Sequence, residues 1–231
     1  MITVNALSEV AALMGDPARA AMLQLLMDGR AHTASDLAHT AGVTAQTASG
    51  HLSRMVEANL LVARAQGRNR FYRLASGDVA HAMESLMALA GQRAEPASQS
   101  AAWRRDPDLR FCRTCYDHLA GQIGIAVTDS LTQHGHLEPK GQRDWNLTPS
   151  GELFCERLGV DIAGARKTGR HFARQCLDWS ERRPHISGAL GAAIADTFFK
   201  RGWAERLRRG RTVRLTDSGR RALTRDFGTS L

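Results

Sequence analysis

Two short helix patterns separated by a single glycine lie between Thr33 and Asn59, and this spacing leaves few possible folds. The run from Thr33 to Asp36 (TASD) has the form of a capping box, with Asp in place of the usual Glu, and it predicts a helix start. Gly42 permits a tight turn, and Thr44 can cap a second helix that runs to about Asn59. The apolar stripe predicted for that second helix consists of Ala48, Leu52, Met55 and Val56.

A basic hairpin is predicted directly after these helices. Two short β-like runs flank Gln66–Asn69 (QGRN), which has the composition of a tight turn. Four arginines fall within ten residues of this segment, at positions 64, 68, 70 and 73. Such a concentration of cations on one projecting hairpin suits contact with phosphates.

The face of the second helix opposite its apolar stripe carries short hydrogen-bonding side chains and one cation, which suit the base edges and phosphates of a DNA major groove. Gly50 on this face is either tolerated or allows close approach to DNA, and His51 either packs inward or contacts a phosphate. The candidate DNA contacts are Ser35, Thr44, Gln46, Thr47, Ser49, Gly50, His51, Ser53 and Arg54 on the helices and Arg64, Arg68 and Arg70 on the hairpin.

Residues Ser35–Leu74 resemble the winged helix-turn-helix of the ArsR/SmtB family of bacterial transcription regulators. The resemblance rests on SDLA, AGVT, a Ser-x-His-Leu in the second helix, a GR turn and a Tyr-x-Leu strand, and it covers roughly residues 5–90. It implies a homodimer joined through the first helix and the helix at 77–90. It also implies a repressor that reads a palindromic operator and leaves DNA when a signal binds. The helix at 34–41 lacks the cysteines through which many members sense metals.

The remainder of the chain contains an internal repeat. His118–Glu138 aligns without gaps with His185–Glu205, with seven identical positions that include both glycines of a GxxG. Each copy is predicted to be a helix, a short two-stranded wing and a second helix capped by Thr148 or Thr216. The small residues of the GxxG are expected to let two helices pack closely. The predicted fold class is therefore mainly α with small β wings (α+β), a winged helix-turn-helix followed by two winged-helix-like half repeats.

These patterns divide the chain into three parts. Residues 1–90 form the predicted DNA-binding and dimerisation domain, residues 91–108 a linker, and residues 109–231 a C-terminal sensor or support domain. The two repeats span about 112–160 and 173–228.

The cysteines offer three alternatives. Cys112 and Cys115 form a CxxC that is followed by His118, and Cys155 or Cys176 can complete a zinc or copper site. The same thiols can instead form a redox switch, or they can be buried structural residues. Cys115 and Cys176 occupy equivalent positions in the two repeats, which favours a shared structural role. No cofactor is predicted; a metal ion remains an alternative.

Charge adds a constraint on where DNA contacts lie. The chain has a net charge of +8, yet residues 1–90 contain seven arginines and seven acidic residues, so the whole excess lies in residues 91–231. Part of it is on a second predicted wing, and we hypothesise a secondary DNA contact there. The arginines of that wing are Arg208, Arg209, Arg211 and Arg214.

The expected function is that of a dimeric DNA-binding repressor with an unidentified small-molecule, redox or metal effector. Trp145, Trp179 and Trp203 either line a pocket for an organic effector or belong to the core. A thiol-redox or metal-responsive regulator is the first alternative. A protein-binding adaptor and a cysteine-dependent enzyme are the alternatives from other classes, and no catalytic residue is predicted. With no signal peptide and no long apolar run, the protein is expected in the cytoplasm, on the nucleoid when bound.

Overall fold

The computed structural model describes residues 3–93, 107–207 and 210–229. It divides the chain into two compact units, Met1–Met83 and Glu84–Leu231. Most of the predicted linker, residues 94–106, lies outside the described residues. Its first three residues belong to a helix that begins in the first unit, and its last two open the next helix.

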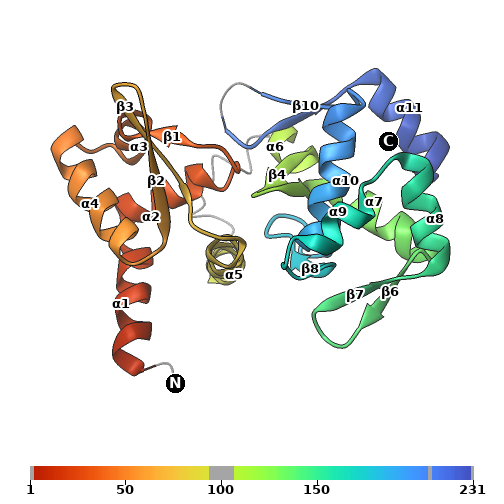
Figure 1. Cartoon of the computed structure of the whole chain (residues 1–231), viewed down its shortest axis with the longest axis horizontal. Coiled ribbons are helices and arrows are strands. Elements are labelled where there is room, and N and C mark those ends of the chain that lie inside the picture. Colours follow the sequence, from red (N-terminus) through yellow and green to blue (C-terminus); the bar gives the residue numbers. More distant parts are fainter. Residues whose placement is uncertain (1–2, 94–106, 208–209, 230–231) are drawn as a thin grey trace. The chain divides into compact units, whose positions relative to one another are not determined.

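In the described part of the first unit, four helices and the start of a fifth accompany a small sheet (Figure 1). Its strands are antiparallel in the order β1-β3-β2. The elements are α1 (Val4–Gly15), α2 (Pro17–Leu26), β1 (His32–Thr33), α3 (Ala34–Ala41), α4 (Ala45–Glu57), β2 (Leu61–Gln66), β3 (Asn69–Leu74) and α5 (Gly77–Arg93), which continues into the second unit.

The capping residues expected from the sequence start and end the helices of the first unit. Thr33 and Asp36 form a capping box at α3, and Gly42 ends that helix in the left-handed conformation with φ 66°. The Thr44 hydroxyl accepts from the Thr47 backbone N–H and begins α4. Only a short turn separates the two helices, which pack against each other. Leu37 of α3 and Leu52 of α4 are fully buried.

The second unit consists of two copies of one arrangement: hairpin, helix, hairpin, helix (Figure 1). The first copy comprises β4 (Arg113–Cys115), β5 (His118–Ala120), α7 (Gly121–Gln133), β6 (Leu137–Lys140), β7 (Asp144–Leu147) and α8 (Pro149–Leu158). The second comprises β8 (Arg174–Leu177), β9 (Pro184–Ser187), α10 (Gly188–Lys200), β10 (Ala204–Arg206), β11 (Val213–Leu215) and α11 (Asp217–Phe227). The short helices α6 (Pro107–Phe111) and α9 (Ile162–Lys167) precede the first copy and separate the two.

The helix, wing and second helix of each copy agree with the sequence prediction, and Thr148 and Thr216 cap α8 and α11. The hairpins β4–β5 and β8–β9 that precede α7 and α10 were not predicted. Strands β6, β7, β8 and β9 form one antiparallel sheet, in which the pair Asp144 and Arg174 joins the two copies.

One apolar core serves both repeats. It takes Ile123 and Val127 from α7, Leu190 and Phe198 from α10, and Phe227 from α11. Trp203 belongs to the same core and meets Phe198 edge to face. Neither repeat therefore encloses a core of its own. Within the described part of the chain, no helix combines the length and apolar character needed to cross a bilayer.

Candidate DNA-binding face and cysteine–histidine site

Helix α4 is divided lengthwise into a buried and an exposed face. Ala48, Leu52 and Met55 are fully buried, and Val56 is half-buried. The opposite face is open to solvent along the length of the helix. Its exposed residues are Gln46, Thr47, Ser49, Gly50, Ser53 and Arg54.

The wing is a hairpin with a two-residue turn, and its arginines extend into solvent. Gln66 pairs with Asn69, and Gly67 takes φ 59° in the turn, a backbone conformation that favours glycine. Arg64 lies opposite Phe71, whereas Arg70 lies opposite Ala65, so the two arginines stand on different faces of the hairpin. Arg64, Arg68 and Arg70 are all exposed. Ser35 and Thr44, at the starts of α3 and α4, are exposed as well.

His51 is half-buried and faces back toward the first unit's own core. Its Nδ1 lies 3.1 Å from Nη1 of Arg19, which also donates to the main-chain carbonyls of Ala12 and Leu13. Since an arginine is always a donor, Nδ1 accepts and the ring proton is on Nε2. The other ring nitrogen of His51 is therefore a donor.

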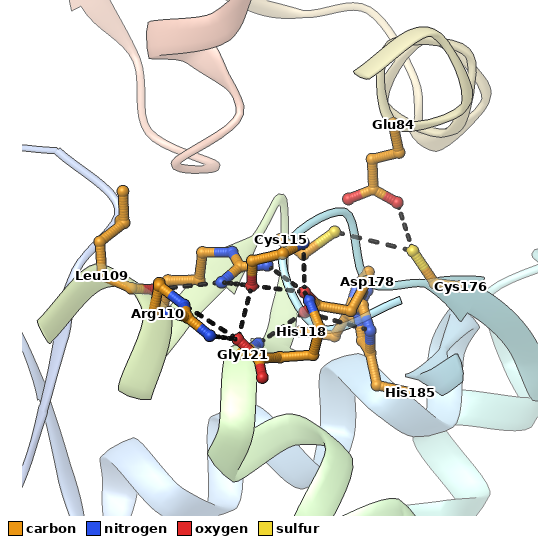
Figure 2. Close-up of polar contacts among 12 residues, drawn as sticks. Glu84, Leu109, Arg110, Cys115, His118, Gly121, Cys176, Asp178 and His185 are labelled. Carbon is orange, nitrogen blue, oxygen red and sulfur yellow. Dashed lines mark hydrogen bonds and ion pairs between the residues drawn. The ribbon is translucent and has the colours of Figure 1, made fainter. Parts of the chain in front are cut away.

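In the second unit, two hairpins bring four metal-ligand side chains together. Cys115 and His118 are directly opposite each other in β4–β5, and Cys176 and His185 are directly opposite each other in β8–β9. Directly opposed residues of an antiparallel pair project from the same face. Each hairpin therefore presents one thiol and one imidazole side by side, and the two hairpins face each other (Figure 2).

The four ligand atoms form a tight, buried cluster. The Sγ atoms of Cys115 and Cys176 are 3.8 Å apart, and the Nε2 atoms of His118 and His185 are 3.1 Å apart. All four atoms lie within 4.8 Å of one another. The four side chains belong to residues that are only 1–4% exposed. The thiol of Cys176 also donates to the carboxylate of Glu84 (Figure 2).

A carboxylate stands behind each histidine. Asp117 Oδ1 is 3.2 Å from Nδ1 of His118, and Asp178 Oδ2 is 3.7 Å from Nδ1 of His185. Asp178 is held in place by Arg113, whose Nη2 donates to Oδ1 at 2.6 Å, and by the backbone N–H of Gly121. Burial would raise the pKa of both aspartates, but His118 and Arg170 hold the pKa of Asp117 below its usual range, and Arg113 and His185 do the same for Asp178.

The electrostatics of the cluster favour a thiolate beside an imidazolium. Burial would raise the pKa of Cys115, but hydrogen bonds from Cys176 and the two histidines hold it well below its usual value. Burial would lower the pKa of His118, but the Cys115 and Asp117 charges raise it to about 9. The pKa of Cys176 is raised by its bond to Cys115 and by burial, and that of His185 is lowered by burial.

Comparison with known proteins places the chain among regulators of transcription. The family described as helix-turn-helix domain matches residues 14–64. The uncharacterized HTH-type transcriptional regulator YdfF of Bacillus subtilis (strain 168) is 39% identical over 225 residues, which cover 97% of this chain and 98% of the relative. The chain belongs to the HTH-type transcriptional regulators. The helix-turn-helix predicted from the sequence is thereby confirmed in this regulator.

Solved structures similar to this regulator include two that are described as transcriptional regulators. The DNA-binding fragment of Mb0332 from Mycobacterium bovis, described as homodimeric and as a possible ArsR-family regulator, is 26% identical with a TM-score of 0.37. The match covers 40% of the regulator and 84% of the Mb0332 fragment. The transcriptional repressor BigR from Xylella fastidiosa is 21% identical with a TM-score of 0.34, over 37% and 86% of the two chains.

The structure of the regulator brings together only some of the residues predicted to bind a metal or form a redox switch. Cys115, His118 and Cys176 meet, but Cys112 and Cys155 lie in the apolar core, where burial raises their pKa values to about 12 and about 11. The CxxC is not a unit, because Cys112 lies in a bend between α6 and β4 and packs in the apolar core, whereas Cys115 ends β4 opposite His118. Sequence analysis missed His185, although the repeat aligns it with His118.

One other expectation for the second unit, on the role of its paired glycines, is also corrected. The GxxG glycines do not join two helices: a Cβ on Gly124 would lie 2.5 Å from the Leu119 carbonyl oxygen, so this glycine lets α7 approach a strand. In the second wing, Arg211 is buried beside Trp179, and Arg214 pairs with Glu205. Arg208 and Arg209 lie outside the described residues. Trp179 and Trp203 are buried, and Trp145 is half-buried.

Proposed function

We propose that this regulator is a homodimeric repressor that binds a palindromic operator through α4 and the β2–β3 wing. The observation that carries the proposal is that one domain has both a polar, solvent-facing side of α4 and an exposed arginine hairpin, although its net charge is zero. Since residues 1–90 have no overall positive charge to attract DNA, binding must come from this local arrangement.

The α4 side chains are assigned to the DNA major groove, and the wing arginines are assigned to the DNA phosphates. Gln46 and Arg54 are long enough to reach base edges, where Gln pairs with adenine and Arg with guanine. Ser35 and Thr44, at helix starts, suit phosphates, because N-terminal backbone N–H groups also point outward there. Thr47, Ser49 and Ser53 add short donors and acceptors along the same face.

Exposed apolar side chains on α1 support the homodimer. Leu7 is 63% exposed, and Val4 and Val10 lie on the same helix at spacings of three residues. A row of this kind leaves apolar area in water that a second copy would cover. Two-fold symmetry in the dimer would match two half-sites of a palindrome.

The test is binding to a palindromic fragment from the region upstream of the regulator's own gene. Fluorescence anisotropy should show saturable binding at one dimer per fragment, with an affinity that falls steeply as salt rises. A fragment of the same composition with one half-site scrambled is the control. Equal binding to both fragments would contradict operator recognition, and binding of a monomer would contradict the dimer.

A further inference from the structure

We infer that Cys115, His118, Cys176 and His185 bind one zinc-class divalent metal ion in each chain. The four residues come from two hairpins, β4–β5 and β8–β9, which are equivalent elements of the two repeats. The inference goes beyond the proposed function, because it concerns the second unit alone and does not require DNA binding.

The separations between like atoms match the edges of a tetrahedral zinc site. Zn–S bonds of about 2.3 Å place two tetrahedral sulfurs about 3.8 Å apart, and Zn–N bonds of about 2.0–2.1 Å place two nitrogens about 3.3 Å apart. The observed separations are 3.8 Å for the Sγ atoms and 3.1 Å for the Nε2 atoms. These two pairs of ligand atoms therefore need shifts of only a few tenths of an ångström to bind one ion.

The orientation of the histidines argues for a cation between them. With Asp117 behind His118 and Asp178 behind His185, the Nδ1 atom of each ring faces a carboxylate. The two Nε2 atoms point at each other and share a hydrogen bond, so a metal ion that replaces the shared proton would be coordinated by both rings. A carboxylate behind a ligating histidine is the usual supporting arrangement.

Charge and burial fit a closed, structural type of site. Two thiolates neutralise one divalent ion, and the outer aspartates are neutralised by Arg113 and Arg170. Cysteine and histidine together select zinc over the oxygen-preferring calcium and magnesium. Four buried protein ligands leave no open position, which is typical of zinc sites that stabilise a fold. Here the ion would tie the two repeats together.

Equivalent glycines of the two repeats stand next to the histidines of the site. A Cβ on Gly191 of α10 would lie 3.3 Å from Cβ of His118, which is tighter than ordinary contact, and one on Gly124 of α7 would lie 3.8 Å from Cβ of His185, which is ordinary contact. Gly191 therefore gives room to the histidine of the other repeat.

The test measures metal in the purified full chain under reducing conditions. Chelator-treated protein titrated with Co²⁺ should bind one ion per chain, with the thiolate charge-transfer band and intense visible bands of a tetrahedral site. Zn²⁺ should displace Co²⁺ and abolish these bands. C176S and H185Q should weaken binding at least tenfold. D117N should weaken it by about tenfold with the same stoichiometry.

The matched control is C155A, which removes a buried thiol outside the cluster. It should keep one ion and the same spectrum. Loss of the ion in C155A with retention in C176S would overturn the assignment. So would a wild-type spectrum without thiolate bands, an outcome that needs no variant to fold.

A redox pair is the competing result. For a disulfide, the sulfurs of Cys115 and Cys176 would have to approach from 3.8 Å to about 2.05 Å, and the two histidines would then have no role. Wild-type protein that binds no stoichiometric ion and instead forms this disulfide on mild oxidation would replace the metal site with a thiol switch. Because no DNA is present, none of these outcomes depends on operator binding.

Discussion

Gly50 stands in the interior of α4 with open space in front of it, since a Cβ there would meet nothing within 4 Å. G50A should therefore raise the free energy of unfolding by about 0.5–1 kcal/mol, because glycine is a poor helix former. Urea denaturation measures this. Operator affinity of the same variant separates the two roles considered for Gly50: unchanged affinity means that glycine is only tolerated, whereas a tenfold loss means that DNA approaches the helix there.

Gly191 is the opposite case within a helix. A Cβ on it would lie 2.7 Å from the carbonyl oxygen of Ile186, which is backbone and cannot rotate away. G191A should therefore lower the unfolding free energy of the second unit by about 1–3 kcal/mol, as overpacking in a core does. The G50A variant is the matched control in urea denaturation. A G191A variant as stable as wild type would show that α10 can move away from β9.

At the scale of elements, the sequence predicted what its local signals specify. Caps at Thr33 and Thr44 and a turn at Gly67 marked α3, α4 and the wing, and the structure has them within two residues. Hairpins β4–β5 and β8–β9 left no such signal. Their strands are three or four residues long, too short for alternation to show. Each is held instead by the helix packed on it, which no local pattern encodes.

The wing is the element whose contribution to DNA binding can be measured directly. R64Q/R68Q/R70Q should weaken operator binding and flatten the dependence of log K on log salt by about 0.9 for each phosphate that the wing no longer neutralises. The slope comes from anisotropy titrations at several salt concentrations. R143Q/R182Q/R221Q, a change of equal charge at exposed positions of the second unit, is the control. Equal slopes in the two triple variants would exclude phosphate binding by the wing.

At the scale of the whole molecule, the proposed dimer can be tested with two leucines of nearly equal exposure. Leu7 on α1 is 63% exposed and Leu153 on α8 is 61% exposed. L7E should dissociate the dimer, because symmetry places a charge in the apolar contact twice, and operator affinity should fall with it. L153E should leave the dimer intact. Sedimentation equilibrium measures both, and dissociation by L153E with a dimeric L7E variant would move the interface to the second unit.

The candidate metal site shows why part of it was predictable and part was not. Cys115 and His118 are neighbours in sequence, so a ligand pattern was visible, and the repeat supplied Cys176. The histidine opposite Cys176 lies nine residues further along, because the second repeat has six additional residues in this hairpin. The repeat aligns His185 with His118, and the strand register places it directly opposite Cys176. Cys112 was wrongly grouped with Cys115 because spacing alone does not reveal that a bend turns its side chain into the apolar core.

An ion that joins the two repeats should stabilise one unit and leave the other unchanged. At a free Zn²⁺ concentration a thousandfold above Kd, binding adds about 4 kcal/mol to the stability of the unit that holds the site. A shift of about 2–4 °C per kcal/mol is expected for a unit of this size. Calorimetry of the full chain with Zn²⁺ and with chelator should therefore move the melting of Glu84–Leu231 by roughly 8–16 °C. The melting of Met1–Met83 should stay in place.

In C176S the chelator should shift neither transition, because the variant lacks one of the four ligands and the ion contributes little stability to remove. C155A should behave as wild type. Equal shifts of both units in wild type would mean that the ion acts on something common to the whole chain, such as the dimer. That result would contradict a site confined to the two hairpins, because its ligands all belong to the second unit.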